Sequence, residues 1–321
     1  RKAATEIGLL YYQNGDFNQA IPAYKHVVEK YPGSEEARLA MLDLKSIYVD
    51  MNRIDEFAAL ANAMPGNIRF DTNEQDSLTY VAAEKIYMKG RAEEAKSSFE
   101  KYLQTFPEGA FSLNAHYYLC LIWNEQKNYD MVLEHSGKLL EYPNNPFAEE
   151  AVVMRAEVQF NKLQMEEALA SYKMLKEKAS NVDRRQLAET GILRCAYALR
   201  DDVETIQAAT DLLAEAKLSP ELKNEALYYR GKAYLKQKAD TKALADLREL
   251  AKDTRNLYGA EAKYLVAQSL YDTHQYTAAE KELLGYIEQS TPHAYWLARS
   301  FVLLSDVYVA MGKDLDARQY L

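Results

Sequence analysis

Cysteine is almost absent from this sequence of 321 residues, which contains only Cys120 and Cys195. Both lie in apolar helical patterns and are far apart in the sequence. We therefore expect two small buried side chains rather than a disulfide or a reactive thiol. Two buried thiols are compatible with any redox compartment, so the compartment stays open.

Long apolar runs are also missing, although 48% of the residues are hydrophobic. No run approaches the roughly 18 consecutive apolar residues that a membrane-spanning helix requires, so we expect no direct membrane insertion. A basic stripe is missing too, because the 39 lysines and arginines are dispersed and the formal net charge is −9. Nucleic acid and anionic membranes are therefore not expected partners.

Motifs for catalysis and metal binding are missing as well. The five histidines are spread along the sequence, with no carboxylate or cysteine at metal-ligand spacing. The sequence has no phosphate-binding loop, dinucleotide glycine fingerprint or nucleophile elbow. Paired acids such as Glu166-Glu167 stand at helix starts, where the helix dipole favours negative charge. We therefore expect no enzyme activity, no metal and no cofactor.

A repeat is present throughout the chain. In its first copy, two short helical patterns meet at Gly15-Asp16, with small residues at Gly8 and Ala20. The pattern returns every 36 to 38 residues. The position of Ala20 is taken by Phe57, Ala95, Val132, Ala168, Ile206, Ala243, Ala279 and Ala317, and that of Gly8 by Lys45, Ala83, Cys120, Ala156, Arg194, Gly231, Ala267 and Ser305. In the sixth copy, Arg194 and Ile206 also allow a register shifted by one or two residues.

Small residues at fixed places let paired helices cross closely, and a helix pair of this size buries its apolar face only by stacking on its neighbours. The sequence therefore predicts an all-α fold, an α–α superhelix in the form of a right-handed solenoid of about nine helix-turn-helix units in a single domain. The expected units are 1–34, 35–70, 71–109, 110–146, 147–182, 183–219, 220–256, 257–293 and 294–321. A stretch rich in Pro, Gly and Asn predicts an irregular junction at 64–76. The last unit stops in mid-helix, so we expect further chain after Leu321, and we expect that the N-terminus, which begins at Arg1, has been trimmed.

The repeat resembles the tetratricopeptide repeat, whose motif runs Trp-x-x-Leu-Gly-x-x-Tyr, then Ala-x-x-x-Phe, then Pro. The matching residues are Gly8, Tyr11, Ala20, Tyr24 and Pro32 in unit one and Ala83, Ile86, Ala95, Phe99 and Pro107 in unit three. The unit endings at 31–37 and 142–151 are similar to the longer-repeat subtype found in bacterial envelope-associated members. The resemblance implies a bacterial protein of the periplasm or outer membrane, with a cytoplasmic location as the alternative.

In this family the first helix of each pair lines a concave face, and the resemblance carries that face over to this chain. The implied ligand-binding residues are Tyr12, Tyr80, Tyr87, Tyr117, Asn124, Tyr228, Lys232, Tyr264, Gln268 and Tyr271. Tyrosine suits recognition because its rigid ring and hydroxyl bind at modest entropy cost. The alternative is that several of these rings pack between adjacent first helices.

The leading interpretation is a non-enzymatic scaffold that binds a peptide or protein segment on the concave face. One alternative is a helical region that positions substrate in a larger enzyme that processes cell-wall glycans. Another is a glycan-binding module, in which tyrosine rings stack on sugar faces. A clamp for a peptide carboxylate is disfavoured, since only Lys232 and Lys236 are suitably placed. The partner's identity and the oligomeric state stay open.

Overall fold

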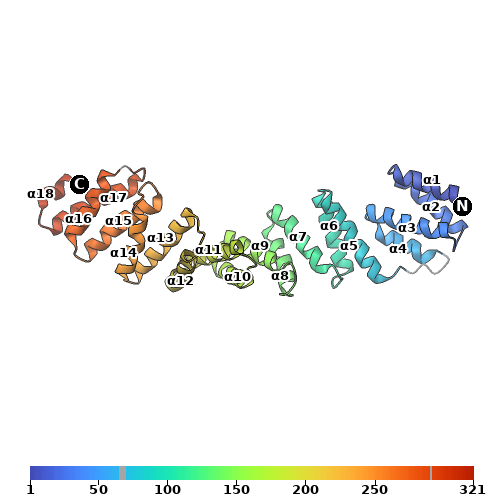
Figure 1. Ribbon diagram of the computed structural model, residues 1–321, viewed down its shortest axis with the longest axis horizontal. Helices are drawn as coiled ribbons and strands as arrows, with labels where there is room; N and C mark the ends of the chain where they lie inside the picture. Colours follow the sequence, from blue (N-terminus) through green and yellow to red (C-terminus); the bar gives the residue numbers. More distant parts are fainter. Residues whose placement is uncertain (65–69, 290) are drawn as a thin grey trace. The chain divides into compact units, whose positions relative to one another are not determined.

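The computed structural model describes residues 1–64, 70–289 and 291–321, and all regular secondary structure in that part of the chain is α-helical (Figure 1). The chain divides into two compact units, Arg1–Arg155 and Ala156–Leu321, and the division falls inside helix α9 (Ala148–Asn161). None of the described helices is long and apolar enough to cross a bilayer.

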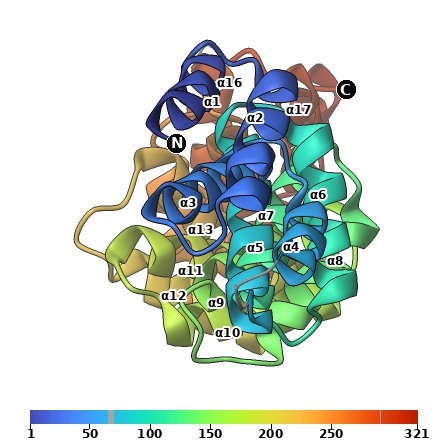
Figure 2. The same cartoon turned by 90° about the vertical axis from the view of Figure 1, so that its right-hand side faces the viewer.

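The described residues of the first unit form eight further helices, and Figure 2 views the unit from the side of its N-terminal helices. From α1 to α8 each helix packs on the next one along the chain, α1 also contacts α3, and α3 contacts α5. The helices are α1 (Lys2–Gln13), α2 (Phe17–Lys30), α3 (Glu35–Asp50), α4 (Ile54–Ala63), α5 (Thr72–Met88), α6 (Ala92–Thr105), α7 (Ser112–Glu125) and α8 (Tyr129–Leu140).

The second unit repeats this arrangement. Its odd-numbered helices contact one another in the order α11, α13, α15 and α17. We call the odd-numbered helices of the chain the first helices and the others the second helices. The elements are α10 (Met165–Lys178), α11 (Val182–Ala198), α12 (Asp202–Leu213), α13 (Pro220–Lys236), α14 (Asp240–Leu250), α15 (Leu257–Asp272), α16 (Tyr276–Glu288), α17 (Ala294–Ala310) and α18 (Asp314–Gln319).

Within the described residues, two helices lie in each of the nine sequence ranges, except that α11 starts one residue before its range. That the nine pairs form a single domain stays a prediction. Of the expected irregular junction at 64–76, residues 65–69 lie outside the described residues. Beyond them, Asp71 caps α5 by accepting a hydrogen bond of 2.7 Å from the Glu74 backbone N–H.

One residue in the left-handed backbone conformation closes the turn of every described helix pair. Their φ angles lie between 56° and 76°. Glycine adopts this conformation freely, whereas other residues do so at a steric cost. The nine residues are Gly15, Asn52, Gly90, Lys127, Leu163, Arg200, Lys238, His274 and Gly312. They set the register of the repeat independently of side-chain size.

This register corrects the sixth unit by one residue. Counting five residues on from the left-handed Arg200, as Ala20 follows Gly15, gives Thr205 and not Ile206. Thr205 is 1% exposed, whereas Ile206 is partly exposed. Counting seven residues back gives Leu193, which is 0% exposed, and not the exposed Arg194. The alternative register shifted by one residue is therefore the right one for this pair.

Close packing explains the small residues of the first pair. A Cβ atom added at Gly8 would lie 2.8 Å from the Tyr24 ring, so any larger side chain would push the two helices apart. Ala20 and Tyr24 are both 0% exposed. The small residue is thus required where the aromatic ring of the second helix meets the first.

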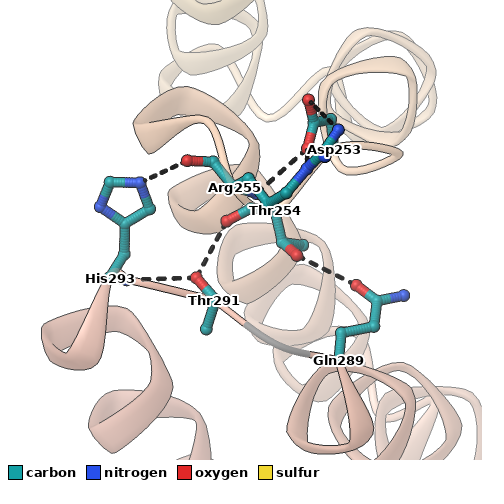
Figure 3. A network of polar contacts seen from close by, with 6 residues as sticks. All are labelled: Asp253, Thr254, Arg255, Gln289, Thr291 and His293. Atoms are coloured by element: carbon teal, nitrogen blue, oxygen red, sulfur yellow. Dashed lines mark hydrogen bonds and ion pairs between the residues drawn. The ribbon is translucent and has the colours of Figure 1, made fainter.

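Polar contacts join consecutive connections at the end of the second unit (Figure 3). Thr291 Oγ1 donates a hydrogen bond of 2.9 Å to the backbone carbonyl of Thr254, and Thr254 Oγ1 donates one of 3.1 Å to Gln289 Oε1. His293 Nε2 lies 2.8 Å from the Arg255 carbonyl oxygen. The connection before α15 is therefore held to the connection before α17.

Candidate interaction surface

Four tyrosines form a continuous row of rings across the first helices of the second unit. Tyr197 of α11 stacks on Tyr229 of α13 at a centroid distance of 4.1 Å, and the adjacent Tyr228 stacks on Tyr258 of α15 at 4.6 Å. The rings of Tyr228 and Tyr229 are 5.5 Å apart. All four side chains are partly exposed. We call these four residues the tyrosine row.

A charged pair holds Tyr228, one of the two inner rings of the tyrosine row. The Tyr228 hydroxyl donates a hydrogen bond of 2.8 Å to Glu261 Oε2, and Lys232 Nζ donates one of 2.9 Å to Glu261 Oε1. Burial raises the pKa of Tyr228, so this hydroxyl keeps its proton. Burial by itself would lower the pKa of Lys232. The hydrogen bonds to Glu261 and Tyr228 act in the opposite direction, and the net effect is a raised pKa. Lys232 is therefore a fixed cation.

A second charged pair lies beside the middle of the row. Arg194 Nε and Nη2 donate to the two oxygens of Glu225 at 2.6 and 2.8 Å, which is the bidentate geometry that guanidinium and carboxylate groups favour. The Glu225 side chain is 11% exposed and that of Arg194 is 43% exposed. Burial also raises the pKa of Tyr229 to about 12. The row thus combines neutral phenol rings with paired charges of both signs.

Tyr264 forms a separate cluster with α17. Its ring is 5% exposed, its hydroxyl donates to Gln268 Oε1 at 2.9 Å, and Arg299 Nη2 donates to that hydroxyl at 2.9 Å. Gln268 Nε2 in turn donates a hydrogen bond of 2.8 Å to Asp272 Oδ1. Tyr264 therefore belongs to the core, which corrects the expectation that its ring faces a ligand.

Tyr80 is also a core residue. It is 3% exposed, its ring stacks on Phe111 at 4.6 Å, and its hydroxyl donates to Glu84 at 2.8 Å. Tyr118 of the next first helix donates to the same carboxylate oxygen at 3.0 Å. The alternative that rings pack between adjacent first helices is therefore correct for Tyr80.

The remaining predicted residues are partly or fully exposed and lie at separate places. Tyr12 packs against Phe17, Tyr87 against Tyr118, Tyr117 against Phe147 and Tyr271 against Tyr276, while Asn124 is exposed on α7. Of the ten predicted residues, the structure joins Tyr228 to Lys232 and Tyr264 to Gln268. Tyr197, Tyr229, Tyr258 and Glu261 were not predicted. The one feature of the sequence that could have indicated the row is the pair of adjacent tyrosines Tyr228-Tyr229.

Both cysteines are buried and free, as the sequence predicts. Burial raises the pKa of Cys120 to about 12 and that of Cys195 to about 11, so both are thiols at neutral pH and poor nucleophiles. The described residues include no group of three or more histidine, cysteine, aspartate or glutamate side chains able to hold a metal ion.

Comparison with known families gives two matches, at residues 11–78 and 225–253. Both matches are to tetratricopeptide repeats. Repeats of this kind generally mediate interactions between proteins and are typically not catalytic. The second match contains Tyr228, Tyr229 and Lys232. Neither match bears on the longer-repeat bacterial envelope subtype, and the glycan-related alternatives gain no support.

Solved structures with tetratricopeptide repeats resemble the chain at low identity. The P58(IPK) repeat domain has 13% identity and a TM-score of 0.31, over 99% of this chain and 90% of that one. A STAND signal-transduction ATPase with a repeat sensor, from Pyrococcus horikoshii, has 16% identity and a TM-score of 0.47, over 100% and 52%. A repeat protein from Parabacteroides merdae has 16% identity and a TM-score of 0.31, over 77% and 91%. No curated protein matches the chain.

Proposed function

We propose that this protein is a non-enzymatic scaffold that binds an extended segment of another protein on the first helices of its second unit. The tyrosine row is the observation that carries the proposal. Tyrosine side chains offer large apolar contact area at low conformational cost and are enriched among residues that dominate binding energy. Here four of them lie on three consecutive first helices, already held by stacking.

Preorganisation supports the same proposal. Glu261 and Glu225 hold Lys232 and Arg194 in fixed positions beside the rings. A partner therefore meets rings and charges that need little further ordering, and this reduces the entropy lost on binding. The partner would be an extended segment whose aromatic, proline or aliphatic side chains lie on the rings.

The test selects peptides from a displayed random library against the whole chain and then measures their dissociation constants. Tyr229→Ala should weaken the selected peptides by at least roughly tenfold, the size typical of an interface hot spot. Tyr228→Phe keeps the ring and loses only the hydroxyl, so it should weaken them less. Tyr142→Ala is the matched control, since Tyr142 is 49% exposed and lies outside the row, after α8. Equal affinities for the Tyr229 variant and the wild type would reject the proposal.

A further inference from the structure

A small cleft in the second unit lies between α10, α11 and α12. Its volume is about 310 Å³. It is lined by Lys173, Lys176, Glu177, Glu189, Ile192, Glu204, Ala208 and Asp211. None of these residues belongs to the tyrosine row or to its two charged pairs, so the cleft is a separate feature of the unit.

Glu189 is the unusual residue of this cleft. The residue is only 3% exposed. Its Oε1 atom lies 3.5 Å from Lys176 Nζ, but its buried Oε2 atom has no hydrogen-bond partner among the described residues. Buried carboxylate oxygens are normally satisfied, because leaving one without a partner is costly. A donor that reached this oxygen from the cleft would therefore satisfy it.

The other charges of the cleft leave it with an excess of negative charge. Lys176 Nζ donates to Asp211 Oδ2 at 2.7 Å, and Lys173 Nζ donates to Glu204 Oε2 at 2.9 Å. Four lining residues are acidic and two are lysines. Lys173 is thus paired with Glu204, and Lys176 is shared by Asp211 and Glu189 Oε1. Two lysines do not balance four acids, so a cation is the ligand that the remaining charge favours.

We propose that this cleft binds the primary ammonium group of a short aliphatic chain, with Glu189 Oε2 as its acceptor. An ammonium group is compact and carries three donors, so it fits beside a carboxylate that already faces Lys176 on its other oxygen. Ile192 and Ala208 supply an apolar wall for the methylene groups. The volume lies at the lower end of the range for small-molecule sites, which suits a chain of about four carbons.

The experiment titrates the whole chain with n-butylammonium and monitors binding by calorimetry at constant ionic strength. Saturable binding is expected in the wild type, with a loss of at least roughly tenfold in Glu189→Gln, because the charge-assisted hydrogen bond is removed. Glu215→Gln is the matched control: it makes the same charge change near Glu189 without lining the cleft. It should bind within about twofold of the wild type if a single hydrogen bond decides the affinity.

A second measurement does not depend on how the variants fold. Burial raises the pKa of Glu189, with Lys176 acting in the opposite direction. Asp211, Glu215, Glu204, Glu177, Lys173 and Lys176 are the other charged groups around it. The wild-type affinity should rise between pH 4.5 and pH 7.5 as Glu189 ionises. A flat profile would overturn the proposal.

Further ligands identify the source of the ammonium group. N-acetyl-lysine methylamide should bind if the natural ligand is a lysine side chain of a partner, and its uncharged norleucine counterpart should not. Binding of n-butylammonium and 1,4-diaminobutane without the lysine amide would make it a site for a free amine. The proposal fails if none of the ammonium ligands saturates the chain, if n-butanol binds equally well, or if Glu215→Gln loses as much affinity as Glu189→Gln.

Discussion

Tyr228 and Glu261 are 33 residues apart in the sequence, on α13 and α15, and they are joined by a hydrogen bond of 2.8 Å. The bond connects two neighbouring first helices at the surface where the four tyrosine rings lie. Lys232 completes it by binding both groups, at 3.0 Å from the Tyr228 hydroxyl and 2.9 Å from Glu261. The same three side chains therefore contribute to the stacking of the repeat and to the shape of the proposed binding surface.

Glu261→Gln should destabilise the second unit by about 1–3 kcal/mol, because Lys232 then keeps its charge in a partly buried position without a counter-ion. Urea unfolding measures the change in the free energy of unfolding. The control is Glu35→Gln, which breaks the exposed pair with Arg38, where the two side chains are 66% and 60% exposed. The control should unfold like the wild type, since exposed pairs contribute little. Equal effects of the two changes would contradict this assignment.

Thr205→Leu should destabilise the chain by about 1–3 kcal/mol, because position 205 is 1% exposed and has no room for added methyl groups. Ala243→Leu, at the same place in the next unit, should cost a similar amount. Ile206→Leu is the control at a partly exposed position and should change little. Thermal unfolding with circular dichroism measures all three. A larger effect at 206 than at 205 would restore the register that this structure corrects.

The sequence predicts the helix pairs well because their determinants are local and recur in phase. Small residues such as Ala20 and Ala95 and turns at Gly15 and Gly90 report directly on close packing and on left-handed backbone. The sixth unit was displaced by one residue because it lacks both signals: Arg200 closes its turn, and Leu193 and Thr205 stand where most units have glycine or alanine. A left-handed arginine leaves no mark in the sequence.

The binding residues were harder to predict. Helix periodicity shows on which side of its own helix a residue lies, but not which residues of the neighbouring helix pack against it. Tyr80 and Tyr264 have the same periodicity as Tyr228, yet Phe111 covers the first and Trp296 and Arg299 pack against the second. Tyr258 lies in the first turn of α15, away from the expected positions. It belongs to the row because α15 packs beside α13, which brings its ring onto Tyr228. These contacts depend on tertiary structure alone.

Gly90→Ala should destabilise the chain by about 1 kcal/mol, because Gly90 has a φ of 76° and alanine adopts that conformation only with strain. A Cβ atom added there meets nothing within 4 Å, so the effect is conformational and not steric. Lys238→Gly makes the reverse change at a φ of 57° and should cause no loss of stability, since relief of strain offsets the greater freedom of the unfolded chain. A neutral Gly90→Ala variant in urea unfolding would contradict the account.

The stability of the first unit should fall as the pH falls from 7 to 5. His116 and His135 face each other with their Nδ1 atoms 2.9 Å apart, and burial lowers the pKa of each to about 4. The folded chain therefore binds these protons less readily than the unfolded chain, whose histidines titrate near 6.5. The loss begins below that value and continues toward pH 4, and by pH 5 it should amount to about 2–4 kcal/mol.

Urea unfolding at pH 7 and pH 5 measures this loss. Other groups also titrate in that interval, so the comparison is with the double variant His116→Phe, His135→Leu at the same two pH values. The double variant should lose less stability than the wild type. Parallel losses in the two proteins would show that the histidine pair does not cause the pH dependence.

Hydrogen–deuterium exchange of the whole chain, with and without a selected peptide, tests the proposed binding surface most directly. The account predicts slower exchange on peptide binding in the helices that carry the row, at residues 194–198, 225–232 and 258–264. It predicts little change in α12, α14 and α16. Protection confined to those second helices, or to the first unit, would contradict the account.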